Sequence, residues 1–425
     1  MEKGKLEKLY TLEVLTSSTR KKYYVDNRGQ VDVSEILQRI FDETAELSAN
    51  SDGGASYIFS QGIYFVNAPL KVQHASVKIS GSGHSGIDIH GINIAGGTCF
   101  YFGPACFPAC MTFSGGGVKK AFPSNEKPWD LQCARIEIEN ITFAGHNNTD
   151  VDTARGYSRM KGDLPDFRSL KWYPQTCRYD DIQRDGQRGI VLSRNSKKCK
   201  PEMLRVTNCC FTDLYVGIDI EICDVTQISH SWFAQMVYGV VSHGLGQATN
   251  VSDCCFADLE TALSLKNISM SNLHHNSFAY VSKCFCLGEV SHSSITGNVL
   301  NNWKASTAAA SCGAFCQIKG PAKNITITAN SIFQEHDSRT KALTIDPEPD
   351  GTSFIHFNEC SNLLFSNNVV DTLISNDVIK ITHSKNCKFS NNIINNGPGG
   401  NMINCEDNCS NICCRNNDNF GNTQE

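Results

Sequence analysis

One short phrase recurs along the middle of the chain, and its spacing constrains the fold more than any other feature. Each copy places a small or polar pair in front of a large apolar residue. These apolar anchors are separated by 22, 23, 22 and 22 residues, so residues 204–300 form a sequence repeat. The anchors are Phe211, Phe233, Phe256, Phe278 and Leu300.

The interior of each repeat has the composition of β-strands. Residues 216–222 alternate β-branched residues with glycine and acidic residues. A helical pair needs a repeat of about 34 residues, so this repeat is too short for one. Two or three short strands with tight turns fit instead, and together they make one coil. The predicted fold class is all-β: a single-stranded, right-handed parallel β-helix, a pectate-lyase-like solenoid with an N-terminal capping helix.

A second position, two residues before each anchor, is always small or polar. Side chains of this kind can hydrogen-bond the coil above or below, so we predict a ladder along one turn. The repeat continues after two longer coils, with steps of 32, 38 and 24 residues, and we assign the excess to loops at coil corners. The predicted ladder consists of Cys209, Ser231, Cys254, Asn276, Asn298, Asn330, Asn368 and Asn392.

The N-terminal region predicts a cap for the solenoid. Residues 1–30 are interpreted as a polar leader, and residues 31–50 as a helix that opens with a capping box at Asp32-Val33-Ser34-Glu35. Ile36, Leu37, Ile40 and Phe41 then lie on one face of this helix. Because an open end would expose strand edges and core, we expect the helix to cover it.

The remaining residues are expected to form one domain. A solenoid lengthens by adding coils, so residues 51–420 need not be divided. Within them, residues 153–186 are rich in charged and aromatic side chains and read as an inserted flap over a site. Residues 421–425 are assigned to a tail.

Composition limits the partners that we expect. A net charge of -5 without a basic stripe argues against nucleic acid. No apolar run is long enough for a membrane span, and the first residues lack the apolar core of a signal peptide, so the expected location is the cytoplasm. The 21 cysteines are expected to be free, buried thiols, and we expect no metal and no other cofactor.

Acidic residues are predicted on one outer face. If Ile218 and Ile220 point inward, Asp219 and Glu221 point outward onto an exposed face. Steps of 22 and 23 residues then align Glu221, His243 and Lys266 in one column. Two carboxylates beside a histidine can act on a glycosidic bond. The alternative is a solvated face held by ion pairs.

Four features of the sequence carry a resemblance to a known family. They are the turn Gly81-Ser82-Gly83-His84, the 22-residue step, Gly189-Ile190-Val191-Leu192, and above all residues 244–249, Gly-Leu-Gly-Gln-Ala-Thr. Over residues 30–300 the chain resembles the inulin fructotransferases and difructose anhydride hydrolases of glycoside hydrolase family 91. The resemblance implies a right-handed β-helix, a homotrimer with sites between subunits, no cofactor, and intramolecular fructosyl transfer or its hydrolytic reversal.

The chain departs from that family at two positions. The family's Asp and Glu align with His230 and Val241, which are not carboxylates. Our hypothesis is therefore a displaced site that handles a related saccharide. Its catalytic candidates are Asp219, Glu221, His230, His243 and Asp253, and its substrate-binding candidates are Gln247, Lys266, Trp172, Tyr173, Arg178 and Asp181.

Three functions follow from these features. The first is a carbohydrate-active enzyme that cleaves or rearranges a glycosidic bond, with a fructan or a difructose anhydride as substrate. The second is a uronan lyase or epimerase, which needs Arg and Lys side chains to neutralise substrate carboxylates. The third is a non-catalytic saccharide-binding or structural solenoid, which the replaced Asp and Glu positions favour.

Overall fold

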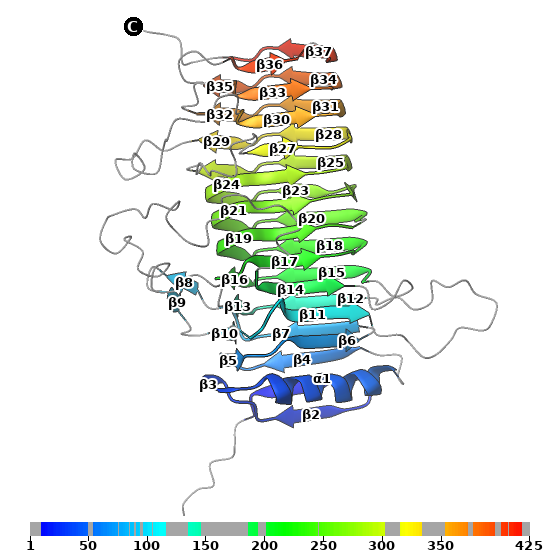
Figure 1. Ribbon diagram of the computed structural model, residues 1–425, viewed down its shortest axis with the longest axis vertical. Helices are drawn as coiled ribbons and strands as arrows, with labels where there is room; N and C mark the ends of the chain where they lie inside the picture. Colours follow the sequence, from blue (N-terminus) through cyan, green and yellow to red (C-terminus); the bar gives the residue numbers. More distant parts are fainter. Residues whose placement is uncertain are drawn as a thin grey trace, which may run out of the picture.

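The chain forms a stack of coils whose strands pair with those of the next coil. The computed structural model describes residues 10–49, 54–74, 76–84, 86–88, 91–93, 97–103, 105–115, 135–145, 186–193, 201–244, 246–301, 315–333, 353–372, 377–395, 401–406 and 408–418. Figure 1 shows the coils rising from the N-terminal end to the C-terminal end, with strand above strand. The predicted parallel β-helix with a helix at its N-terminal end is confirmed.

One long sheet forms the first side of the stack. Its strands pair in parallel from β4 onward, and β1 pairs with both β2 and β4 in antiparallel fashion. Its strands are β1 (Leu12–Leu15), β2 (Arg20–Tyr23), β4 (Ala55–Phe59), β7 (Ser76–Ser80), β12 (Arg135–Glu139), β15 (Met203–Thr207), β18 (Val225–Ser229), β20 (Ala248–Ser252), β22 (Ile268–Ser269), β23 (Asn272–His274), β25 (Val290–Thr296), β28 (Ala322–Thr328), β31 (Cys360–Ser366), β34 (Lys385–Ser390) and β37 (Ser410–Arg415).

The second sheet folds around the rest of the coil. Each of its long strands, such as β19, pairs along its first part with one strand of the previous coil and along its second part with another. The strands are β3 (Arg28–Asp32), β5 (Gly62–Val66), β6 (Leu70–His74), β10 (Thr98–Phe102), β11 (Ala109–Gly115), β13 (Thr142–Ala144), β14 (Arg188–Ser193), β16 (Cys210–Thr212), β17 (Val216–Ile220), β19 (Trp232–Ser242), β21 (Cys255–Leu265), β24 (Ser277–Leu287), β26 (Val299–Asn301), β27 (Cys316–Ile318), β29 (Ser331–Phe333), β30 (Ile355–Asn358), β32 (Val369–Asp371), β33 (Ile379–Thr382), β35 (Ile393–Asn395) and β36 (Ile403–Cys405). A separate hairpin pairs β8 (Gly86–Asp88) with β9 (Gly91–Asn93).

The predicted anchors form one internal stack. The rings of Phe211 and Phe233 lie 4.9 Å apart, those of Phe233 and Phe256 4.9 Å, and those of Phe256 and Phe278 5.2 Å. All four side chains are buried, and Leu300 continues the same register. Burying each large apolar side chain contributes roughly 1.5–3 kcal/mol, so the stack is a main source of stability in these coils.

The predicted polar ladder is also present. The side-chain amide of Asn276 donates to Oδ1 of Asn298 at 3.0 Å, and Asn298 donates in the same way to Asn330 at 3.0 Å. The ladder continues through Asn368 and Asn392 and extends beyond the prediction to Asn417. These bonds satisfy buried amides and hold adjacent coils in register.

The N-terminal end is covered as predicted. Helix α1 (Ser34–Ala49) packs its buried face onto the first coil, where the rings of Phe41 and Tyr57 lie 4.8 Å apart. Asp32 caps it by accepting from the backbone N–H of Ser34 at 2.9 Å. The predicted leader is not a plain extension, because β1, β2 and most of β3 lie within it. Strand β1 is only four residues long and includes Glu13, too short a stretch for a period to be recognised.

Two further expectations can be compared with the structure. Most described cysteines are free and buried, as predicted, although Cys405 and Cys414 in the last coil are exposed. None of the described helices has the length and apolarity that crossing a membrane requires. The predicted flap at 153–186, apart from Gly186, and the predicted tail at 421–425 lie outside the described residues.

Candidate functional site

A buried carboxylate on the outer side of the coil is the centre of the candidate site. Asp219, in β17, is only 2% exposed. Arg188 donates from Nη1 to Asp219 Oδ2 at 2.6 Å, and Nε2 of His243 lies 2.6 Å from Asp219 Oδ1. Both carboxylate oxygens are therefore engaged, one by a cation and the other by an imidazole.

Three successive coils bring these groups together. Arg188 begins β14, Asp219 lies in β17 of the next coil, and His243 directly follows β19 of the coil after that. Residue Ile220 pairs with Ser242 in parallel register, and the backbone N–H of His243 donates to the Ile220 carbonyl at 3.0 Å. The repeat spacing thus places the histidine one coil away from the aspartate.

The surroundings of Asp219 exclude water. Its neighbours in the same outward column are Val191 and Val241, which are both buried. An apolar cluster on this outer side also includes Tyr215 and Tyr238. We expected Asp219 on an exposed face, and this was wrong, because Arg188 and His243 from the neighbouring coils contact its two carboxylate oxygens and the side chain is buried. Strand alternation predicts direction from the core but not exposure.

Burial changes the proton affinities of this site. It raises the pKa of Asp219, while the hydrogen bond and charge of Arg188 favour the ionised carboxylate and oppose the rise. Burial and the charge of Lys266 lower the pKa of His243 to about 4. His243 is therefore neutral near pH 7, and the tautomer that donates Nε2–H to Asp219 has a lone pair on Nδ1.

The predicted column of Glu221, His243 and Lys266 is present. The backbone N–H of Lys266 donates to the Ser242 carbonyl at 3.0 Å, which continues the register of His243. Glu221 and Lys266 are both exposed, and the charge of Glu221 acts on Asp219. An acidic, an imidazole and a basic side chain therefore lie in successive coils about 4.8 Å apart.

His230 and Asp253 lie elsewhere, at coil corners. His230 is in the turn between β18 and β19, and Asp253 is in the turn between β20 and β21, with φ of 50° and 55°. Asn208 and His275 have the same conformation in the neighbouring coils. Asn, Asp and His are enriched in this left-handed region, so the turn conformation explains both residues. The structure does not bring them to Asp219.

The structure describes two of the six predicted substrate-binding residues, Lys266 and Gln247. Lys266 lies beside His243, as described above. Gln247 is exposed just before β20, and its backbone N–H donates to the Asp224 carbonyl at 2.9 Å. The other four, in the predicted flap, lie outside the described residues: Trp172, Tyr173, Arg178 and Asp181.

Arg188 is the site residue that sequence reasoning missed. It directly precedes the phrase Gly189-Ile190-Val191-Leu192, which was recognised as a strand entering the repeats. It pairs with Val216, three residues before Asp219, and its long side chain reaches the carboxylate from there. That register is hidden in the sequence, since the stretch between Phe143 and Phe211 does not keep the 22-residue step.

The described residues do not form a metal site. Within the described part of the chain, no three or more His, Cys, Asp or Glu side chains are grouped so that they could hold a metal ion. The site holds two side chains of the kind that transfer protons, the imidazole of His243, whose Nδ1 is buried, and the exposed carboxyl of Glu221.

Comparisons with known proteins place the fold. No family model matches the chain, and no curated protein matches it. Among solved structures, it is similar to DFA-IIIase from Arthrobacter chlorophenolicus A6, at 14% identity and a TM-score of 0.58 over 91% of this chain and 84% of that one. The same enzyme without its lid, in complex with GF2, gives 13% identity and a TM-score of 0.60 over 92% of each chain. A mutant tailspike protein of E. coli bacteriophage HK620, in complex with a pentasaccharide, gives 10% identity and a TM-score of 0.50 over 93% of this chain and 63% of that one. At these identities the likeness establishes the β-helix fold that this chain shares with them.

Proposed function

We propose that this protein acts on a glycosidic bond through proton transfer at His243. The observation that carries the proposal is the buried Asp219 carboxylate held between Arg188 and His243 on the outer side of the coil. A carboxylate that accepts from one imidazole nitrogen fixes the tautomer and leaves the lone pair on the other nitrogen, while burial keeps the pKa of His243 low. Saccharides named with the solved structures of similar fold support this class of substrate.

The residues have separate roles in this proposal. Nδ1 of His243 is buried in the structure, so substrate must displace what covers it before this nitrogen can act. It then takes the proton from an attacking hydroxyl, a sugar hydroxyl in intramolecular transfer or water in hydrolysis, as the hydroxyl oxygen bonds to the anomeric carbon. The bond from the anomeric carbon to the leaving oxygen breaks, and that oxygen takes a proton from the carboxyl group of Glu221. Exchange with solvent then returns both groups to their starting states. Asp219 and Arg188 position the imidazole and do not touch the sugar.

A fructan or a difructose anhydride is the leading substrate. Two features support it, namely the family resemblance of the sequence and the names of the solved structures with the same fold. Intramolecular fructosyl transfer and hydrolysis require the same proton movements, so the products must distinguish them. Assembly into a homotrimer and a cytoplasmic location stay predictions.

One observation favours a second function, that of a uronan lyase or epimerase. Lys266 follows His243 in the same column and lowers its pKa. A neutral histidine beside a lysine could remove the proton next to a uronate carboxylate while the lysine neutralises that carboxylate. A lyase would then leave an unsaturated sugar that absorbs ultraviolet light.

The test is product analysis with three substrates. The wild-type protein is incubated with inulin, difructose anhydride and polygalacturonate, and products are separated by chromatography with ultraviolet detection. New fructo-oligosaccharides, a difructose anhydride or fructose support the proposal, and unsaturated galacturonides support the lyase. If a folded wild-type protein forms no product from any of them, the proposed activity on these glycans is wrong and the non-catalytic solenoid is favoured.

A further inference from the structure

Two columns of outward-facing side chains continue from the candidate site toward the C-terminal end. Parallel pairing of β21, β24, β27, β30, β33 and β36 aligns them coil by coil. We call these two columns the axial strip. One column contains Ser264, Cys286, Gln317, His356, Lys380 and Asn404, and the other contains Lys266, Gly288, Lys319, Asn358, Thr382 and Glu406.

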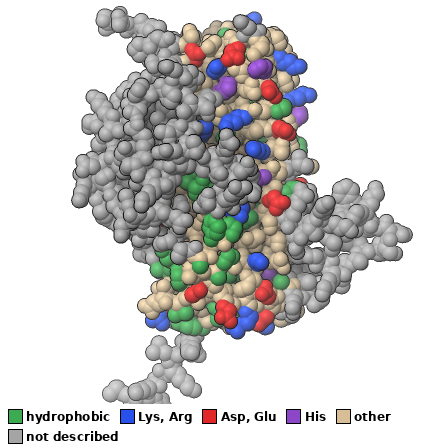
Figure 2. Space-filling view, in the orientation of Figure 1, with side chains coloured by type: hydrophobic (Ala, Val, Ile, Leu, Met, Phe, Trp, Pro, Cys, Tyr) green, Lys and Arg blue, Asp and Glu red, His purple; other side chains and the backbone are tan. Residues whose placement is uncertain are grey.

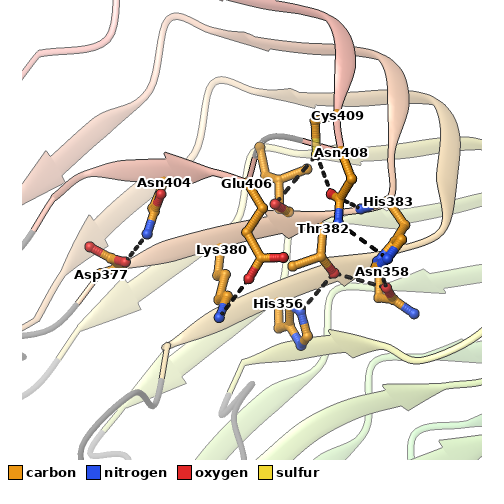
Figure 3. A network of polar contacts seen from close by, with 11 residues as sticks. His356, Asn358, Asp377, Lys380, Thr382, His383, Asn404, Glu406, Asn408 and Cys409 are labelled. Atoms are coloured by element: carbon orange, nitrogen blue, oxygen red, sulfur yellow. Dashed lines mark hydrogen bonds and ion pairs between the residues drawn. The ribbon is translucent and has the colours of Figure 1, made fainter.

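The far end of the strip carries a network of polar contacts, shown in Figure 3. Nε2 of His356 lies 3.2 Å from Oγ1 of Thr382, and Thr382 donates to Oδ1 of Asn358 at 2.8 Å. Nδ1 of His383 lies 3.2 Å from the same Asn358 oxygen. The backbone N–H of His383 donates to Asn408 at 2.8 Å. Three adjacent coils thus present imidazole, hydroxyl and amide groups together.

Charged groups flank this network. Lys380 and Glu406 form an ion pair with a 3.0 Å separation, and their side chains are 31% and 40% exposed. Asp377 accepts from the side-chain amide of Asn401 at 2.8 Å and also from that of Asn404. Burial lowers the pKa of His356, and the charges of Lys380 and Lys319 lower it further, so its imidazole is neutral near pH 7. Figure 2 shows Lys, Arg and His side chains, with Asp and Glu among them, on the visible face over the upper coils.

This network differs from the one that holds the coils in register. The ladder from Asn276 to Asn417 uses one residue type and is mostly buried. The network at the end of the strip mixes residue types, and His356, Asn358 and Lys380 are only half-buried while His383 and Asn408 are exposed. Half-buried neutral donors and acceptors beside a charged pair suit sugar hydroxyls, which both donate and accept.

We propose that the axial strip binds an extended saccharide chain along the solenoid axis, with the network around His356 and Lys380 as a subsite remote from His243. Five coils separate the row of His243 from that of Thr382, a distance of about 24 Å at ~4.8 Å per coil. Apart from the β24 coil, where the strip holds Cys286 and Gly288, consecutive coils offer a polar side chain at intervals comparable with the length of a sugar unit. The direction of the chain rests on the proposed function, since it places the reacting bond at His243.

The test measures how affinity depends on saccharide length. Two size-graded series are used, inulin oligosaccharides and oligogalacturonides, and binding is measured by calorimetry in the Asp219→Asn background, in which turnover is expected to be slow. Long members are expected to bind at least tenfold more tightly than the shortest member in one series. The Lys380→Ala/Glu406→Ala double variant removes the ion pair without leaving either charge alone, and it is expected to abolish that tenfold difference.

Two further variants make the result specific. His383→Asn keeps a residue that tolerates the left-handed turn (φ 48°) while removing the imidazole, and it is expected to reduce the difference several-fold. Lys388→Ala alters an exposed lysine of the same coil on β34, in the other sheet, and should leave the difference unchanged. Thermal unfolding checks that each variant is folded.

The outcomes separate this inference from the proposed function. Equal affinity of long and short members, no binding of either series, or a difference that survives in the double variant would each overturn the role of the strip. If long chains bind more tightly through this network but the wild-type protein forms no product, the strip is supported and the glycosidic chemistry is wrong. If the wild-type protein forms product but affinity does not depend on saccharide length, the glycosidic chemistry is supported and the role of the strip is wrong.

Discussion

Nε2 of His243 lies 2.6 Å from Oδ1 of Asp219, although the two residues belong to different coils. The pair connects a buried charge with an imidazole that is 16% exposed. Arg188 supplies the matching cation from a third coil at 2.6 Å, so the arrangement depends on the stacking of three coils in register.

Replacing Asp219 by Asn is expected to reduce turnover on the true substrate about 100-fold or more, as the loss of an acid–base partner commonly does. Asn has the same shape but cannot fix the same tautomer of His243. Steady-state rates measured with purified variants check this, and circular dichroism confirms the fold. His243→Gln should lose a similar factor, whereas Lys388→Ala should retain the wild-type rate. Full turnover in Asp219→Asn would contradict the assigned role.

Removing Arg188 alone is expected to destabilise the protein strongly. Arg188→Ala leaves the Asp219 carboxylate buried without its cation, and breaking a buried pair in this way costs about 3–5 kcal/mol. The Arg188→Met/Asp219→Leu double variant replaces both charges by apolar groups and should be more stable than the single variant. Denaturant titrations of both proteins measure the difference. A single variant that is as stable as the wild type would show that Asp219 does not depend on Arg188.

The low pKa of His243 predicts a dependence of stability on pH. Its pKa is about 4 in the folded protein and near 6.5 in the unfolded chain, so the unfolded state binds more protons between these values. Stability should therefore fall as the pH is lowered from about 6.5 to about 4. His74, whose pKa burial also lowers to about 4, adds to the same fall. The raised pKa of Asp219 has the opposite effect: above pH 3.8 the folded state binds more protons at this carboxyl, so lowering the pH favours folding there.

The measurement for this prediction is the free energy of unfolding at several pH values. His243→Gln should show a shallower fall than the wild type over the same window, because one of the contributing groups has been removed. His74 is retained in both proteins and provides the remaining slope. An identical slope in the two proteins would mean that His243 is not held neutral in the folded state.

Two consecutive aromatic residues test the internal stack. Phe233→Ala should cost about 3–5 kcal/mol, because it opens a cavity in a column of stacked rings. Trp232→Ala is the matched control, since Trp232 points outward from the same strand and is 36% exposed. Its replacement should cost much less. Similar losses from both changes, measured by denaturant unfolding, would argue against the inward direction of Phe233.

Much of the fold could be predicted from the sequence because every coil repeats the same packing problem. Phe211, Phe233 and Phe256 occupy equivalent places, so the spacing alone predicts their stack. The same spacing predicted the column of Glu221, His243 and Lys266. In a solenoid, residues one repeat apart in the sequence lie above one another in adjacent coils, so such columns can be predicted from a single sequence.

The candidate site was less predictable for two physical reasons. The carboxylate of Asp219 is contacted by side chains of the two neighbouring coils, Arg188 and His243, which strand alternation does not report. The position of Arg188 depends on a register that crosses a long stretch without the regular step. His230 and Asp253 differ from Arg188, since their residue types suggested catalysis and the structure places both in turns with a left-handed backbone.

The two ends of the stack differ, and this has a consequence for how the molecule opens. Helix α1 packs over the first coil, whereas Ile403 and Ile412 in the last described coil are only half-buried. Because coils contact only their neighbours, the terminal ones can fray one after another without disturbing the centre. Amide hydrogens near the C-terminal end should therefore exchange first, while those around Asp219 remain protected through many such openings.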